Sequence, residues 1–129
     1  MSRPTGHPLP STAATAAGVD HVLLSYRYLD DGDLDAYGSL FADDAQVNHP
    51  GVPHGQGRRR LLDLHAPLAG PSSRHHVYKV VAQGDAVAVM GRLTRRSPAP
   101  PVDFADFFTL SDDGLLLGYR RFYFTPPPL

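Results

Sequence analysis

The stretch Gly32–Pro50, GDLDAYGSLFADDAQVNHP, constrains the fold most, because it changes from helical to strand periodicity over a short distance. Asp33 is suited to cap a helix whose apolar residues begin directly after it. The apolar residues that share one face of this helix are Leu34, Tyr37, Leu40 and Phe41. Residues 42–44 form an acidic turn, and residues 45–49 then alternate apolar with polar side chains as a half-buried strand does. The stretch therefore predicts a short helix packed on a core, followed by a strand that ends at His49.

Helical spacing of apolar residues also occurs on both sides of this stretch. Residues 19–29 carry apolar side chains at helical intervals, and Asp30-Asp31-Gly32 provides a stop. Residues 58–68 form a third predicted helix, whose leading arginines, Arg58–Arg60, are more typical of a solvated helix face than of an anion site. Two predicted β-hairpins follow, namely 74–83 with 86–95 and 102–110 with 115–124. Helices followed by antiparallel strands predict an α+β fold.

The two ends of the chain lack these patterns. Residues 1–18 are rich in Pro, Ser, Thr, Ala and Gly and have no periodic apolar face, so we expect a disordered lead-in that contributes little stability. The last residues, TPPPL, do not extend a sheet, because proline lacks the backbone donor. The sequence therefore predicts one folded domain over residues 19–125, between the lead-in and a Pro-rich tail at 126–129.

Composition narrows the classes of function. A chain of 129 residues is long enough for one domain with a substantial core. Its 12 Lys and Arg against 13 Asp and Glu leave no basic excess for nucleic acid or an anionic membrane. The lack of cysteine excludes disulfides and thiolate chemistry, and no apolar run reaches the roughly 18 residues of a membrane span. No phosphate loop or dinucleotide motif occurs, so we expect a cytoplasmic protein with no cofactor, no nucleic-acid partner and no membrane partner.

Three segments together resemble a known superfamily: YRYLD, GDLDAYGSLFADDAQV and DFADFFTLSDDGLLLGYRRFYF. They are similar to the nuclear transport factor 2-like superfamily, and within it to SnoaL-like polyketide cyclases and ketosteroid isomerase-like proteins. The resemblance implies a cone-shaped, cystatin-like α+β fold in which three N-terminal helices pack on a strongly curved mixed or antiparallel sheet and enclose a pocket. It implies less about activity, because this superfamily carries isomerases, cyclases, dehydratases, epoxide hydrolases and non-catalytic binding modules.

Asp106 is the first candidate for catalysis. Period two along the predicted strand 102–110 places it on one face with the apolar residues at positions 102, 104, 108 and 110. Desolvation favours the neutral form of a carboxyl group, so we expect Asp106 either to donate a hydrogen bond to a developing enolate or to act as a proton shuttle. The alternative is an Asp106 that accepts bonds from Arg121 and only holds the sheet together. By resemblance, ADFFTLSDDG matches the ketosteroid isomerase segment whose Asp lines the oxyanion hole, and Asp106 occupies that position.

His49 is the second candidate. By resemblance, VNHPG places it where ketosteroid isomerases carry an Asp general base. A neutral imidazole, with a reference pKa of about 6.5, is well matched to proton abstraction at neutral pH. A solvated or structurally bonded histidine is the alternative. The first-helix tyrosine of ketosteroid isomerases falls on Ser25 here, with Tyr26 one place on, so Tyr26 is a candidate substrate contact and steroid isomerisation is not implied.

Other candidate substrate contacts come from the predicted hairpins. Tyr119 and Tyr123 share one face of the last strand, where a phenol can hold an enolate oxygen, although tyrosines there are also typical core residues. His75 and His76 point to opposite faces of a strand, so they do not readily chelate one ion, and we expect no metal site. By resemblance to proteins with an Arg-His pair at this place, His75 is the one that faces the pocket.

Together these residues predict a small cofactor-independent enzyme, an isomerase or lyase that resembles SnoaL-like cyclases and acts on a hydrophobic polyketide-like or terpenoid metabolite. His49 removes a proton next to a carbonyl, and Asp106 with a tyrosine stabilises the enolate during ring closure or double-bond migration. One alternative is an epoxide hydrolase or epoxide-opening cyclase, with an Asp-Arg-Asp grouping drawn from Asp106, Arg121 or Arg92, and Asp103. Another is a non-catalytic ligand-binding or association module. Large apolar residues on both faces of 115–124 also predict a homodimer through the open face of the sheet.

Overall fold

The computed structural model describes residues 9–96 and 99–124. Within these residues the helices are α1 (Thr12–Asp31), α2 (Leu34–Ser39) and α3 (Arg58–His65), the last continued by a 3₁₀ turn, Ala66–Leu68. The strands are β1 (Phe41–Asn48), β2 (Gly55–Gln56), β3 (Ser73–Gln83), β4 (Ala86–Arg95), β5 (Val102–Leu110) and β6 (Leu116–Phe124). The predicted α+β order is confirmed. The expectations for residues 1–8 and for the tail at 126–129 lie outside the described residues.

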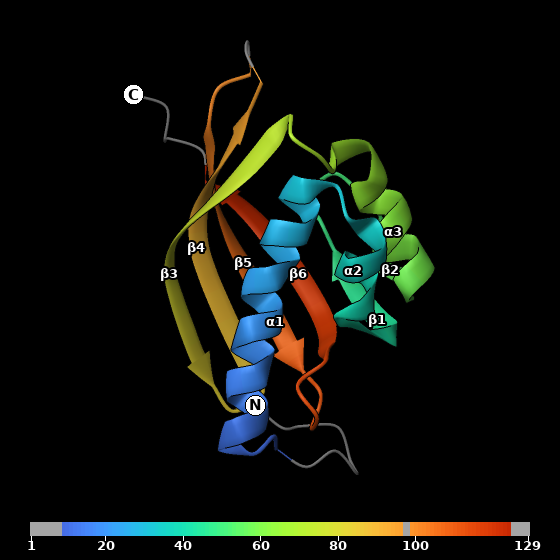
Figure 1. Ribbon diagram of the computed structural model, residues 1–129, viewed down its shortest axis with the longest axis vertical. Coiled ribbons are helices and arrows are strands. Elements are labelled where there is room, and N and C mark those ends of the chain that lie inside the picture. The colour runs from blue at the N-terminus through green and yellow to red at the C-terminus, as the bar shows by residue number, and fades with distance from the viewer. Residues whose placement is uncertain (1–8, 97–98, 125–129) are drawn as a thin grey trace.

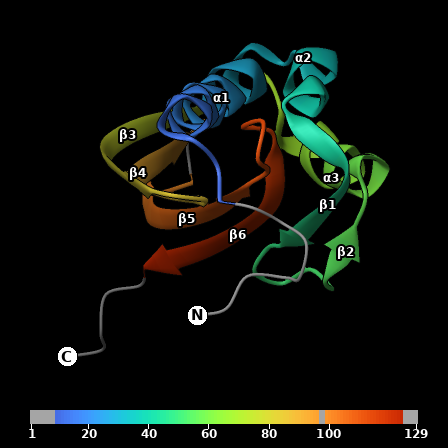
Figure 2. The same cartoon turned by 90° about the horizontal axis from the view of Figure 1, so that it is seen from below.

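The strands form one mixed sheet in the order β2-β1-β6-β5-β4-β3. β1 runs parallel to β6, and the other neighbouring strands are antiparallel. Figure 1 shows α1 lying across one face of the sheet, with α2 and α3 to one side near β1. Seen from below, β3 to β6 curl around α1 (Figure 2). The curved sheet and the helices thus form the predicted cone.

α1 begins earlier than the sequence predicted. Ser11 caps it by accepting a backbone hydrogen bond, so residues 12–18 belong to the helix and not to a disordered lead-in. This first part docks on the sheet: the hydroxyl of Thr15 donates to a carbonyl in the β3–β4 turn at 2.8 Å. Gly18 packs so closely that a Cβ added there would lie 2.4 Å from the side chain of Leu110. Small residues make this contact, and they leave no periodic apolar pattern in the sequence.

Two strands also differ from expectation near their ends. β1 starts at Phe41, which pairs with Leu116 of β6, so residues 42–44 are part of the strand and not a turn. The pairing of β5 with β6 shifts register next to Leu110. Such a bulge changes the face that side chains occupy, and Leu116 is consequently fully buried in the core. Strict alternation along the strand would place Leu116 on the same face as the exposed Phe122.

The core lies between α1 and the concave face of the sheet. Its fully buried large apolar side chains are Tyr37, Phe41, Leu61, Phe104, Leu110 and Leu116. Removing such a side chain from water stabilises the fold by about 1.5–3 kcal/mol. The predicted alternation along β5 is confirmed, because the residues at 104, 106, 108 and 110 are all buried. The sequence pattern therefore placed a carboxylate, Asp106, inside an apolar core.

The opposite, convex face of the sheet carries exposed apolar side chains. They are Met90 on β4, Phe107 on β5, and Phe122 and Phe124 on β6. The rings of Phe107 and Phe122 lie side by side, with centroids 5.8 Å apart. A contiguous apolar patch of this kind is typical of an interaction surface. None of the described helices combines the length and the hydropathy needed to cross a membrane.

Candidate functional site

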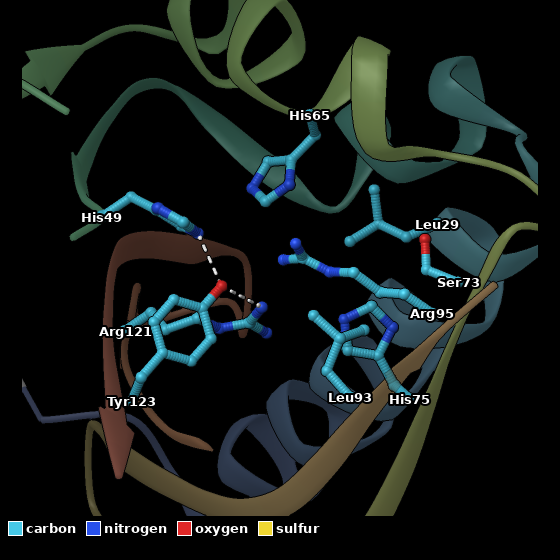
Figure 3. A pocket seen from close by; sticks show the side chains of 9 residues that line it. All are labelled: Leu29, His49, His65, Ser73, His75, Leu93, Arg95, Arg121 and Tyr123. Atoms are coloured by element: carbon cyan, nitrogen blue, oxygen red, sulfur yellow. Dashed lines mark hydrogen bonds between the residues drawn. The ribbon is translucent and has the colours of Figure 1, made fainter. Parts of the chain in front are cut away.

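A cavity opens at the end of the cone where the last turns of α1 and α3 meet the ends of four strands. The residues that line it are Leu29, His49, His65, Ser73, His75, Leu93, Arg95, Arg121 and Tyr123. Figure 3 shows their side chains converging from opposite walls, with His65 facing the strand residues Tyr123 and Leu93. The free volume is about 20 Å³, which is room for roughly one water molecule. The cone is thus nearly filled by its own side chains.

Asp106 lies beneath this cavity and not in its lining. It is fully buried, and its carboxylate accepts bonds from Nε and Nη2 of Arg121, both at 2.8 Å. The hydroxyl of Tyr26 donates a third bond at 2.7 Å. Burial, together with the charge of Asp106, raises the pKa of Tyr26, so this phenol stays a donor. Asp106 therefore accepts three hydrogen bonds, which is the alternative arrangement considered from the sequence. Tyr26 donates one of these bonds and does not line the cavity.

Arg121 links this buried pair to the cavity. Its guanidinium stacks on the ring of Phe104, with the central carbon 4.4 Å from the ring centroid. Its remaining nitrogen, Nη1, donates to the hydroxyl of Tyr123 at 3.5 Å. The contact with Asp106 fixes the plane of the guanidinium, because Nε and Nη2 both donate to the same carboxylate. Arg121 therefore offers one oriented donor edge toward the cavity.

His49 lies at the mouth of the cavity, just after β1, where the sequence predicted it. Its Nδ1 is 3.2 Å from the carbonyl of Pro50 and its Nε2 is 3.4 Å from the hydroxyl of Tyr123. If Nδ1 carries the proton and donates to the carbonyl, Nε2 is an acceptor that faces Tyr123 (Figure 3). Burial lowers the pKa of His49, and the charges of Arg121 and Arg95 act in the same direction, although the Pro50 carbonyl opposes them. The imidazole is therefore neutral at neutral pH and available as a base.

His75 also lines the cavity, whereas His76 is exposed on the other side of β3. The ring of His75 contacts Asp30 through Nδ1 at 2.7 Å, and the backbone amide of His75 donates to the same carboxylate at 2.9 Å. A carboxylate on Nδ1 fixes the orientation of the imidazole and leaves Nε2 to act on other groups. Of the two histidines, His75 is thus the one that lines the cavity.

Tyr119 and Tyr123 have different environments although they share a face of β6. Tyr123 lines the cavity, but Tyr119 is 4% exposed and belongs to the core. The ring of Tyr119 stacks near that of His49 at 6.3 Å, and its buried hydroxyl has no hydrogen-bond partner among the described residues. Burial raises the pKa of Tyr119 well above its usual value. Of the two predicted tyrosines, Tyr123 is the one in position to contact a ligand.

His65 and Arg95 line the cavity and were not singled out from the sequence. His65 ends α3, only 4% exposed, and its ring lies 5.2 Å from that of Tyr37. Burial, with the nearby charge of Arg121, lowers the pKa of His65 to about 3. A signal for His65 existed, because it lies four residues after the buried Leu61 and hence on the same helix face. Arg95 ends β4, and no comparable signal distinguishes it from Arg96 beside it.

The rival Asp-Arg-Asp grouping is not assembled. Arg92 pairs with Asp103 at 2.9 Å, and both side chains are about half exposed on the convex face. Arg121 and Asp106 pair on the concave face of the same sheet. The two ion pairs are thus separated by the sheet itself. Among the described residues, no cluster of His, Asp or Glu has the arrangement of a metal site.

Comparison with known proteins identifies the fold and the family. Residues 22–119 match a sequence family described as the SnoaL-like domain. A proposed SnoaL-like polyketide cyclase from Jannaschia sp. CCS1 is 21% identical, with a TM-score of 0.74 over 95% of this chain and 90% of that one. A proposed ketosteroid isomerase from Kribbella flavida is also 21% identical, with a TM-score of 0.74 over 88% and 84%. A proposed polyketide cyclase from Sinorhizobium meliloti is 25% identical, with a TM-score of 0.67 over 80% and 94%.

These similarities confirm the predicted nuclear transport factor 2-like fold. No curated protein matches the chain. Many of the similar structures have no known function, and the others include cyclases and isomerases by name. The comparisons therefore identify the family and the fold, and they do not identify a reaction or a substrate.

Proposed function

The chain belongs to the SnoaL-like domain family, and we propose that it is a cofactor-independent cyclase or isomerase that works through an enolate. The observation that carries this proposal is the contact of His49 Nε2 with the hydroxyl of Tyr123, 3.4 Å away, at the edge of a cavity. A neutral base and a phenol are thus adjacent where a substrate carbonyl and its α-carbon would lie. The substrate is a hydrophobic metabolite of polyketide or terpenoid type, in line with the apolar walls formed by Leu29 and Leu93.

In the first step, Nε2 of His49 takes a proton from the carbon next to a substrate carbonyl. The electrons of the broken C–H bond form the enolate, whose oxygen accepts hydrogen bonds from Tyr123 and from Nη1 of Arg121. The contacts of 3.4 and 3.5 Å in the free protein are long, so a substrate oxygen can replace them at little cost. The fixed guanidinium needs no reorganisation when the negative charge develops.

In the second step, the imidazolium of His49 returns its proton. For isomerisation the proton goes to a different carbon of the extended enolate. For cyclisation the enolate carbon attacks a second carbonyl of the same substrate, and the resulting alkoxide takes the proton. Neither route needs an oxidant or a metal. Asp106 does not touch the substrate in this scheme; it is a positioning residue that acts through Arg121.

The test measures α-proton exchange, which does not require the natural substrate. In D₂O, the wild-type protein should accelerate deuterium incorporation into a neutral aromatic ketone such as 2-tetralone, followed by proton NMR. His49→Ala should slow the catalysed exchange by roughly 10²- to 10⁴-fold, and Tyr123→Phe by about 10²-fold. His76→Ala is the matched control, because that histidine is exposed outside the cavity. Exchange by His49→Ala at the wild-type rate would refute the assigned base.

A non-catalytic binding role is the second candidate, and the small free volume of about 20 Å³ favours it. A cone filled by its own side chains is expected of a module that binds at its rim. The same exchange experiment separates the two functions. A wild-type protein that binds 2-tetralone without accelerating exchange above the buffer rate would favour the binding role.

A further inference from the structure

The cavity has a surplus of positive charge. Its lining contains two arginines and no acidic side chain, and the lining histidines His49 and His65, with their lowered pKa values, are neutral at neutral pH. The charge of Arg121 is balanced by the bidentate contact with Asp106. Arg95 has no such partner among the described residues. In Figure 3 the Arg95 side chain reaches inward, so that its guanidinium lies in the middle of the cavity.

His65 supplies a second, independent observation. Its ring is 4% exposed, and its buried Nε2 has no hydrogen-bond partner among the described residues. Buried polar atoms are nearly always bonded, because desolvation without a partner is costly. The ring projects into the cavity from α3, opposite the strands (Figure 3). A ligand atom in the cavity is therefore the natural partner for this nitrogen.

We propose that the cavity selects substrates that carry a carboxylate or another delocalised oxyanion, held by Arg95 with Nε2–H of His65 as a second donor. This inference rests on the proposed function and specifies the substrate class for the same site. A guanidinium matches a planar oxyanion through two parallel hydrogen bonds. The neutral imidazole adds one donor, provided that its proton is on Nε2.

Arg95 must move for this to happen, because the free volume leaves no room for a ring beside its guanidinium. Arg95 is the last residue of β4. Its side chain is exposed, so it can swing outward without disturbing the sheet. The side chain of Arg95 thus occupies the place proposed for the substrate. In the complex it shifts far enough to admit the oxyanion between its guanidinium and Nε2–H of His65, while the apolar part of the substrate lies beside Leu93.

Pairing of Arg95 with an anion should also change the pKa of His49, the proposed base. The charge of Arg95 contributes to the lowered pKa of His49, together with the larger effect of burial and the charge of Arg121. An anion that neutralises Arg95 removes this contribution, so the pKa of His49 should rise when an anionic ligand binds. A neutral ligand of the same shape should not have this effect. The proton affinity of His49 is therefore a second readout that is independent of binding strength.

The test compares 2-naphthoate with 2-naphthamide, which has the same shape and no charge, by calorimetry at low ionic strength. The wild-type protein should bind the naphthoate at least ~10-fold more tightly, and added salt should reduce this preference. Arg95→Met should bring the ratio to about one, whereas Arg96→Met, the adjacent exposed arginine, should leave it unchanged. His65→Phe, which keeps a ring without nitrogens, should weaken naphthoate binding several-fold.

Each remaining outcome overturns the inference. Equal binding of the two probes by the wild-type protein, a preference that survives in Arg95→Met, or no binding of either probe at millimolar concentration would do so. A failure here is distinguishable from a failure of the proposed function, because the exchange assay uses a neutral ketone. Exchange that depends on His49 without any preference for naphthoate would overturn the oxyanion site and leave the enolate chemistry intact.

Discussion

The ion pair between Asp106 and Arg121 allows the sharpest stability prediction. The two side chains are 0% and 4% exposed, and Arg121→Met removes both of the bonds that it donates at 2.8 Å. Charge-assisted hydrogen bonds contribute about 1.5–3 kcal/mol each, and breaking a buried pair from one side costs about 3–5 kcal/mol. We expect either Arg121→Met or Asp106→Leu to lower the free energy of unfolding by about 3–5 kcal/mol. For a chain of this size the melting temperature would fall by about 12–20 °C.

The double variant distinguishes an ion pair from two independent contacts. When both charges are removed, no buried charge is left unpaired, so the double variant should be more stable than either single variant. Urea unfolding followed by circular dichroism measures all of these free energies. Tyr26→Phe, which removes only the third bond to Asp106, should cost about 1–2 kcal/mol and provides a variant that still folds.

The second ion pair of the sheet is the matched control. Arg92 on β4 and Asp103 on β5 form an ion pair of the same type between neighbouring strands of the same sheet, but their side chains are 47% and 42% exposed. Arg92→Met should leave the melting temperature unchanged within error. Additive losses in the Asp106 and Arg121 double variant, or equal losses at the two ion pairs, would refute the reasoning.

Three further predictions concern pH, the start of α1 and assembly. His65 has a pKa of about 3 in the folded state against about 6.5 in the unfolded state. The unfolded state therefore binds the proton first, and the free energy of unfolding falls as the pH decreases from 6.5 toward 3. Between pH 7 and pH 5 the free energy of unfolding of the wild-type protein should fall by roughly 2 kcal/mol more than that of His65→Phe, measured in urea titrations. Deleting residues 1–17 should lower the melting temperature by several degrees, because the Thr15 contact is lost; an unchanged value would count against docking of the first helical turns. Light scattering should give twice the 14.0 kDa of the chain, and Phe107→Asp on the convex face should give a monomer; a monomeric wild-type protein would exclude the dimer.

Most of the architecture follows from local patterns. The cap at Asp33, the hairpin turn at Gly84 and the alternation along β5 are each decided by neighbouring residues, and each is where the sequence predicted it. The start of α1 and the bulge in β6 between Leu116 and Gly118 depend on contacts between distant segments. The spacing of large apolar residues does not reveal the close packing of Gly18 against β5 or the extra residue in the pairing of β5 with β6.

The same distinction holds for the site. The sequence could indicate three of the cavity residues: Tyr123 by strand alternation, and His49 and His75 by the family resemblance. The three bonds to Asp106 could not, since they join α1, β5 and β6 and their geometry decides whether the carboxyl group is a protonated donor or an ionised acceptor. Arg95 could not be predicted either, because the direction of a long side chain at a strand end depends on the space that other segments leave.

The parallel pairing of β1 with β6 determines when the cavity can exist. Phe41 pairs with Leu116 and Asn48 with Arg120, so the wall that carries His49 is joined to β6, the last of the described strands. On the ribosome, His49 and His75 are synthesised well before Arg121 and Tyr123, and the cone stays open until β6 has been synthesised. Contacts between residues so distant in sequence are slow to form, because closing a long loop costs entropy before any contact compensates for it. A nascent chain would therefore expose its apolar concave face until β6 is released, which makes this period the one in which aggregation competes most with folding.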